Sequence, residues 1–234
     1  MPGVSALDSD QIDFALPVPV FPLAECVLLP GVTVPLHIFE SRYRVMTAES
    51  VESRRLISMA CFEGDGWQKD YEGKPPICRT VCIGEITRCD RLDDGRYHLL
   101  LRGAARARIR REIPHDPYRI AELSPTEPRV MEIDVEPQRR ALEEMLDDPV
   151  LSPMPVIGAL NKPCRDEVPT PSLVDQVIFS LCADSGERFG MLEQPEVHER
   201  LAFAVERLRQ TRQAIELAAR TRPTAHGDDA LSMN

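Results

Sequence analysis

Three cysteines are the residues whose type and spacing come closest to a chemical site. Cys78, Cys82 and Cys89 follow the pattern C-x3-C-x6-C. Zinc binds thiolates but needs four ligands, so the fourth would have to be Cys61, His98 or a water molecule. In an extended strand Cys78 and Cys82 share a face about 13 Å apart, too far for one ion without a bulge. We therefore expect small buried thiols, with no metal and no other cofactor.

Residues that could carry catalysis are scattered. The only Gly-Lys pair, Gly73-Lys74, precedes Pro75 and lacks the upstream glycine of a phosphate-binding loop. A Ser–Lys catalytic pair has few candidates, and His37 lies in an apolar stretch where a packed histidine is expected. The sequence therefore predicts no catalytic residues and no enzyme, and a small-molecule hydrolase is the weakest alternative. The chain has three lysines: Lys69, Lys74 and Lys162.

The densest basic cluster lies at residues 102–111. Arg106, Arg108 and Arg110 alternate there, so they share one face of a strand. Such a face could meet the phosphates of RNA, but the chain has a formal net charge of −10 and this stretch has no aromatic residue for base stacking. We expect a solvated strand face, and nucleic acid is disfavoured as a partner.

The proline-rich apolar stretch 17–43 is the segment around which the other elements are placed. Proline is excluded from helix interiors and central strands. The stretch therefore predicts two short strands, at 18–21 and 33–38, joined through a turn at Pro30-Gly31. A helix at 41–53 follows.

The rest of the chain changes character part-way along. Strands are predicted first, then amphipathic helices, of which the last is the longest. The long loop at 63–76 carries Trp67, the only tryptophan, and Tyr71. Further strands are predicted at 56–62, 77–88, 97–101, 104–113, 118–123 and 129–135, and helices at 137–146, 170–183, 188–193 and 196–220.

This order predicts an α+β protein, a β-rich part followed by a helical bundle with one long terminal helix. We divide the chain into a flexible arm at 1–16, a β-rich subdomain at 17–135, a helical subdomain at 136–221 and a flexible tail at 222–234. No apolar run reaches bilayer length and the N-terminus lacks a basic signal-like region, so we expect a cytoplasmic protein with reduced cysteines and no membrane contact.

Four motifs in order resemble the substrate-binding N-terminal domain of Lon proteases. The first is P-V-F-P-L at 19–23 with L-L-P-G and P-L-H-I-F-E up to residue 40. The others are V-C-I-G-E-I at 81–86 with the hairpin D-D-G-R, L-R-G-A-A-R-A-R-I at 101–109, and Y-R-I-A-E at 118–122. The resemblance covers roughly residues 17–220.

The resemblance implies a PUA-like pseudobarrel followed by a helix bundle. In Lon this pair precedes an ATPase and a protease domain, so the chain resembles a free-standing relative without them. The implied function is non-catalytic, proteolysis-related binding of an unfolded or partner polypeptide. The alternative is an RNA-binding PUA-like protein that uses the 102–111 face, and weak homo-oligomer formation is left open.

Sequence-tolerant binding of polypeptide needs exposed apolar or aromatic surface. Two segments are candidates: the opening hairpin, with Val27, Leu29 and Val32, and the long loop, with Trp67 and Tyr71. We expect Trp67 to be partly exposed, because its polar neighbours form no stripe that would carry it inward. The competing interpretation is that its indole closes an open end of the barrel.

Overall fold

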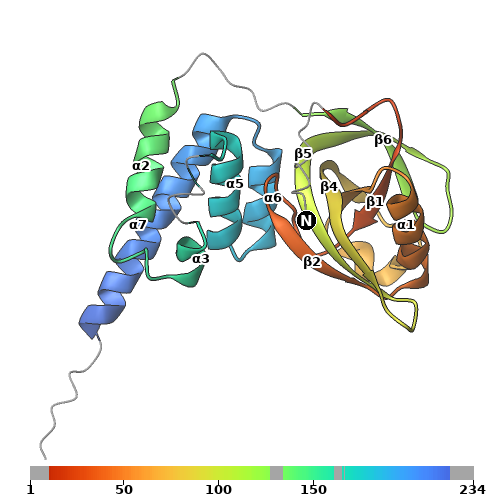
Figure 1. Ribbon diagram of the computed structural model, residues 1–234, viewed down its shortest axis with the longest axis horizontal. Helices are drawn as coiled ribbons and strands as arrows, with labels where there is room; N and C mark the ends of the chain where they lie inside the picture. The colour runs from red at the N-terminus through yellow and green to blue at the C-terminus, as the bar shows by residue number, and fades with distance from the viewer. Residues whose placement is uncertain (1–10, 127–133, 161–164, 166, 222–234) are drawn as a thin grey trace, which may run out of the picture.

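The computed structural model describes residues 11–126, 134–160, 165 and 167–221 (Figure 1). The predicted tail at 222–234, the first ten residues of the predicted arm and all but two residues of the predicted strand at 129–135 lie outside this part. The strands are β1 (Val18–Pro22), β2 (Thr33–Ile38), β3 (Leu56–Phe62), β4 (Ile77–Arg91), β5 (Tyr97–Ile113) and β6 (Arg119–Pro125). The helices are α1 (Ser41–Glu52), the 3-10 helix η2 (Gly66–Asp70), α2 (Glu136–Leu146), α3 (Pro155–Gly158), α5 (Thr170–Leu181), α6 (Ser185–Glu193) and α7 (Val197–Thr221).

The six strands form one mixed sheet in the order β2-β5-β4-β3-β1-β6, and β5 also pairs with β6. That extra pairing closes five strands into a barrel and leaves β2 as an edge strand beside β5. Pro35, in the middle of β2, suits an edge because proline has no N–H to donate. All five closed strands contribute to one apolar cluster, which includes Val18, Val20, Leu56, Val81, Ile83, Ala105, Ala107, Ile109, Ala121 and Leu123.

β5 is a single long strand, although the sequence predicts two strands separated near Gly103. At Gly103 the strand continues without a break, and the segment around Gly31 crosses over it at close range. Gly31 donates its N–H to the Gly103 carbonyl (2.9 Å), and Gly103 donates its own to the Val32 carbonyl (2.8 Å). A Cβ at Gly103 would lie 2.2 Å from the backbone oxygen of Leu29. Only glycine allows the opening segment to approach β5 this closely.

The helix α6 begins earlier than predicted, at Ser185 instead of residue 188. Ser185-Gly186 was expected only to end the preceding helix. The side chain of Asp184 accepts a hydrogen bond from the N–H of Glu187 at 2.8 Å, which caps the first turn of α6. Because Asp184 caps the first turn, Ser185 and Gly186 begin a helix instead of only ending the preceding one.

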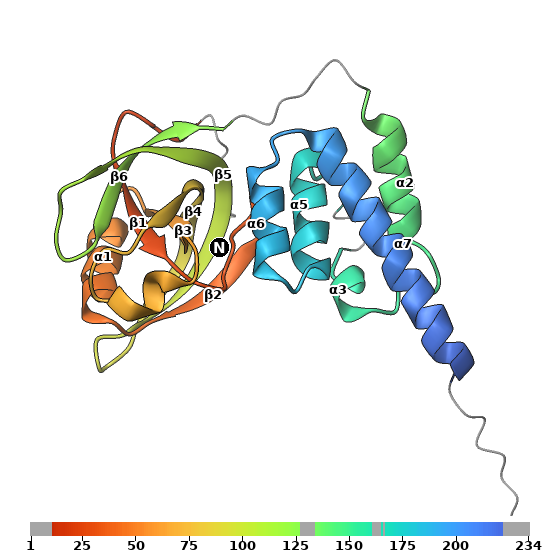
Figure 2. The same cartoon turned by 180° about the vertical axis from the view of Figure 1, so that it is seen from behind.

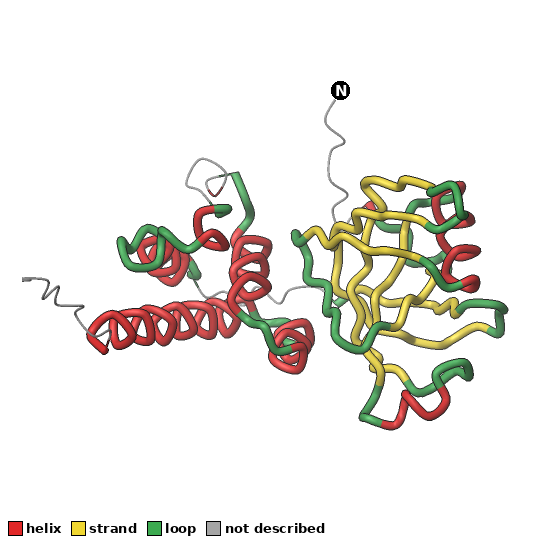
Figure 3. Tube along the Cα trace, turned by 90° about the horizontal axis from the view of Figure 1, so that it is seen from below, coloured by secondary structure: helices red, strands yellow, loops and turns green. Residues whose placement is uncertain are grey.

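The helices of the second half gather on one side of the barrel, as Figure 3 shows from below. In Figure 2, α6 lies between the barrel and the other helices, and α1 lies on the opposite side of the barrel. One apolar cluster runs from barrel residues such as Leu29 and Leu101 to helix residues such as Val177 and Leu201. The α+β class predicted from the sequence, a β-rich barrel and then a helical bundle, is confirmed. Within the described residues, no helix combines the length and apolar content needed to cross a bilayer.

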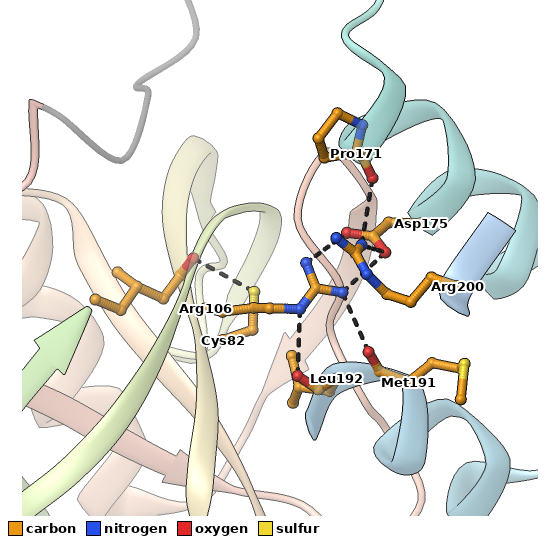
Figure 4. A network of polar contacts seen from close by, with 8 residues as sticks. Cys82, Arg106, Pro171, Asp175, Met191, Leu192 and Arg200 are labelled. Atoms are coloured by element: carbon orange, nitrogen blue, oxygen red, sulfur yellow. Dashed lines mark hydrogen bonds and ion pairs between the residues drawn. The ribbon is translucent and has the colours of Figure 1, made fainter. Parts of the chain in front are cut away.

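A buried ion network joins the barrel to the bundle (Figure 4). Arg106 of β5 donates two hydrogen bonds to the carboxylate of Asp175 on α5, at 2.6 and 2.8 Å. Arg200 of α7 donates to the same carboxylate. Arg106 also donates to the carbonyls of Leu192 (3.2 Å) and Met191 (3.3 Å) at the end of α6. The Arg106 guanidinium therefore also satisfies the C-terminal carbonyls of a helix, where positive charge is favourable.

The network is fully withdrawn from solvent. The Asp175 and Arg200 side chains are 0% exposed and that of Arg106 is 4% exposed. Burial lowers the pKa of Arg200, and the adjacent Asp175 carboxylate opposes that shift. Two buried cations depend on one carboxylate, so losing that carboxylate would leave both without a counter-charge.

We predict that Asp175→Asn lowers the free energy of unfolding by about 3–5 kcal/mol, because the amide keeps the shape but removes the only negative charge of the network. Urea unfolding followed by circular dichroism measures the change. Asp90→Asn is the control: it breaks a surface pair with Arg88 whose side chains are 68% and 50% exposed, and it should cost less than about 1 kcal/mol. Equal effects of the two substitutions would contradict a central role for Asp175.

We also predict that Gly103→Ala destabilises the fold by about 1–3 kcal/mol, because its Cβ would press on the backbone of the opening segment. Gly66→Ala is the matched control, since a Cβ there meets no atom within 4 Å. Thermal unfolding of both variants compares them. A Gly103→Ala variant as stable as Gly66→Ala would show that the crossing can yield.

Candidate functional site

Val27, Leu29 and Val32 are core residues with exposures of 1%, 0% and 6%. The expectation that they line an exposed binding surface is wrong. The segment that carries them is pressed against α5, where a Cβ on Gly31 would lie 3.2 Å from the Ser172 side chain. Apolar side chains in this segment therefore join the barrel to the bundle instead of facing solvent.

The three arginines predicted to share one solvated strand face differ in exposure. Arg108 and Arg110 are exposed, but Arg106 is buried in its ion pair with Asp175. The expectation that Arg106 lies on a solvated face is wrong, because α5 and α6 cover that position of β5. The remaining exposed arginines include Arg111, which is paired with Glu122 at 2.5 Å.

The three spaced cysteines all lie on β4 in different surroundings. Cys82 is fully buried, and burial raises the pKa of its thiol to about 12. Cys78 and Cys89 are half-buried, and burial raises the pKa of each. In the part of the chain that the structure describes, no three histidine, cysteine, aspartate or glutamate side chains are grouped to hold a metal ion.

The second predicted segment, the loop at 63–76, forms an aromatic cluster. The Trp67 ring on η2 stacks on Phe62 of β3, with centroids 4.8 Å apart and planes 8° apart. Tyr71 meets both rings at steeper angles, at 5.9 Å from Trp67 and 6.1 Å from Phe62. All three side chains are half-buried. The prediction that Trp67 is partly exposed is confirmed, and the short helix η2, which the sequence did not reveal, turns the indole onto Phe62.

Tyr71 ties this loop to the start of α1. Its hydroxyl donates to Glu40 at 2.5 Å, and Arg42 donates to the Tyr71 carbonyl at 3.3 Å. The Arg42 guanidinium lies 4.7 Å from the ring centres of both Tyr43 and Tyr71. Burial raises the pKa of Tyr71, and its hydrogen bond to Glu40 adds to the shift. These contacts hold the aromatic loop in one position against the barrel.

A cavity of about 370 Å³ lies between this loop, the start of α1 and the β5–β6 connection. Phe62, Tyr71 and Tyr118 line it together with three prolines. Prolines and aromatic rings give the cavity rigid walls, but polar and charged side chains supply most of its lining. The volume falls within the range of ligand pockets. The prolines are Pro22, Pro75 and Pro117.

Two cations of the cavity are held by neighbouring groups. Arg119 is buried and pairs with Glu112 at 3.0 Å. Lys74 donates to the His115 carbonyl at 2.7 Å and to Asp116 at 3.1 Å. The cavity therefore combines rigid aromatic and proline walls with a mainly polar lining, part of which is held in fixed orientation, and it can accept a side chain of another molecule. Sequence reasoning missed this cavity because its walls come from four segments far apart in the chain: the end of β1, the start of α1, the loop after β3 and the β5–β6 connection.

Most of the chain matches one known protein family. Residues 17–210 match the family of the ATP-dependent protease La (LON) substrate-binding domain. The chain belongs to the LON substrate-binding domain family. The resemblance found in the sequence motifs is thus confirmed over the barrel and most of the bundle.

Curated relatives include the Lon protease of Parabacteroides distasonis, 26% identical over 225 residues, which cover 90% of this chain and 26% of the relative. The Lon protease of Desulfosudis oleivorans is 29% identical over 101 residues, which cover 43% of this chain and 12% of the relative. The chain thus spans about a quarter or less of the length of these relatives.

Two solved structures show the same fold. A Lon N-terminal domain protein from Xanthomonas campestris has a TM-score of 0.55 and 23% identity, covering 82% of this chain and 98% of that one. The N-terminal domain of the Mycobacterium avium complex Lon protease has a TM-score of 0.58 and 18% identity, covering 83% and 98%. At these identities the likeness concerns the fold alone.

The stacking of Trp67 on Phe62 predicts a simple optical response. Phe62→Ala should shift the emission of this only tryptophan to longer wavelength and increase quenching by acrylamide, because the indole loses its apolar cover. Phe203→Ala, in the helical part, is the control and should leave the emission unchanged. Unchanged emission of Phe62→Ala would contradict the stack.

Proposed function

We propose that this protein is a non-catalytic binding module for unfolded polypeptide and that its binding site is the aromatic loop with the adjoining cavity. One observation carries the proposal: a half-buried Trp67–Phe62 stack borders a cavity lined by Phe62 and Tyr71. Membership of the LON substrate-binding domain family supports the class of ligand. Val27, Leu29 and Val32 are not part of the proposed surface.

The physical basis is contact that tolerates many sequences. Large aromatic side chains with two rotatable bonds offer contact area at a small entropy cost, and the hydrogen bonds of Tyr71 already fix its position. A cavity beside them can bury one apolar side chain of an unfolded chain, and burial of such a side chain contributes about 1.5–3 kcal/mol. Each contact is weak, so recognition depends on a segment that presents several apolar residues.

The proposal also covers the cellular compartment in which the protein acts and the kind of molecule it binds. Proteins with Lon-like domains act in proteolysis, and we propose that this chain binds its polypeptide in the cytoplasm and performs no chemistry on it. The described cysteines are free thiols, which agrees with a reducing compartment.

We predict that Trp67→Ala weakens binding of a permanently unfolded protein, such as reduced and carbamidomethylated lysozyme, by roughly five- to thirtyfold, as expected for loss of about 1–2 kcal/mol of contact. Fluorescence anisotropy of the labelled polypeptide measures the affinity. Leu217→Ala removes another exposed apolar side chain (63% exposed) and should have no effect.

Affinity unchanged in Trp67→Ala would exclude the aromatic loop as the site. The same assay with a labelled RNA tests the other ligand class. Binding through phosphate contacts of Arg108 and Arg110 would weaken steeply between low and high salt, whereas binding of apolar polypeptide would not. Salt-sensitive RNA binding, lost when both arginines are replaced, would overturn the proposed function.

A further inference from the structure

The cations around the cavity are internally neutralised. Arg42 pairs with Glu40 at 3.1 Å, and Arg119 pairs with Glu112. Lys74 bonds to Asp116. Glu40, the partner of Arg42, stands at the N-cap position of α1, next to the first turn of that helix, which lines the cavity. The site therefore offers little free positive charge to an acidic ligand.

The carboxylates of the aromatic loop are not neutralised by ion pairs. Four carboxylates lie within its sequence, all exposed, and none forms an ion pair with another described residue. Within the loop at 63–76, all of which the structure describes, they face only the ammonium groups of Lys69 and Lys74, and Lys74 is paired with Asp116, so the loop carries an excess of negative charge. The four are Glu63, Asp65, Asp70 and Glu72, of which Glu72 lines the cavity.

The indole adds a second preference for positive charge. Phe62 covers one face of Trp67, and the side chain is still partly exposed. The electron-rich face of tryptophan attracts ammonium and guanidinium groups more strongly than other aromatic rings. In the same site Arg42 already uses the faces of Tyr43 and Tyr71. An incoming cation therefore meets the tryptophan and the loop carboxylates.

We propose that the site selects basic-aromatic polypeptide, segments in which an apolar or aromatic residue lies beside lysine or arginine, and that it discriminates against acidic segments. The apolar residue enters the cavity, while the neighbouring cation lies beside the exposed Glu72 carboxylate, which lines it. This inference rests on the proposed function, because it specifies the ligand of the same site.

Three probe peptides test it, each built from two repeats: Gly-Lys-Phe-Lys-Gly, Gly-Gln-Phe-Gln-Gly and Gly-Glu-Phe-Glu-Gly. Titration against the fluorescence of Trp67 in the intact protein gives the dissociation constants. We expect the lysine peptide to bind roughly five- to tenfold more tightly than the glutamate peptide at low salt, with a smaller ratio at high salt. Glu72→Gln should lower this ratio by about two- to threefold.

Asp93→Asn is the matched control, because it removes one exposed carboxylate from the β4–β5 hairpin, which does not line the cavity. It should leave the ratio unchanged. Equal affinities for the three peptides, or tighter binding of the glutamate peptide, would overturn the charge preference while leaving polypeptide binding intact. An effect of Asp93→Asn equal to that of Glu72→Gln would also overturn it, since the protein's overall charge would then explain the ratio. If no peptide changes the Trp67 signal, the proposed function and this inference fail together.

Discussion

The carboxylate of Asp175 is the interaction on which the arrangement of the two halves depends. Apolar contact between barrel and bundle supplies attraction without direction. The paired hydrogen bonds from Arg106 supply direction, since a guanidinium and a carboxylate match in only a few geometries. Arg200 then ties the long terminal helix to the same point. The bundle is thereby fixed in orientation on β5, and α6 is placed by its last carbonyls.

The ion network and the proposed binding site lie in different parts of the barrel. The ion network lies on the side of the barrel that faces the helices of the second half, while α1 lies on the other side (Figures 1 and 2). The larger apolar cluster reaches both sides, since it includes Tyr43 and Met46 of α1. The proposed site is made only from barrel segments held by local contacts, such as Tyr71 with Glu40. Changes at its surface can therefore alter ligand preference without loosening the junction between the halves.

The sequence was most informative where local rules act alone. Proline placement predicted β2 at its observed bounds, and a short apolar run predicted β3 at its own. Those rules state which residues share a face, but not what covers it. Arg106 was misread because its partner Asp175 lies 69 residues further along the chain. Val27 and its apolar neighbours were misread because α5 covers them, and the cavity was missed because four distant segments build it.

The order of the network along the chain has a consequence for synthesis on the ribosome. All five strands of the closed barrel end by Pro125, so the barrel can form while the later helices are still being made. During that interval Arg106 has neither Asp175 nor Arg200 beside it, and the apolar surface that α5 will cover is open to solvent. A barrel that formed in that interval would expose this apolar surface until α5 is made, and the ion network would be complete only once Arg200 of α7 is in place.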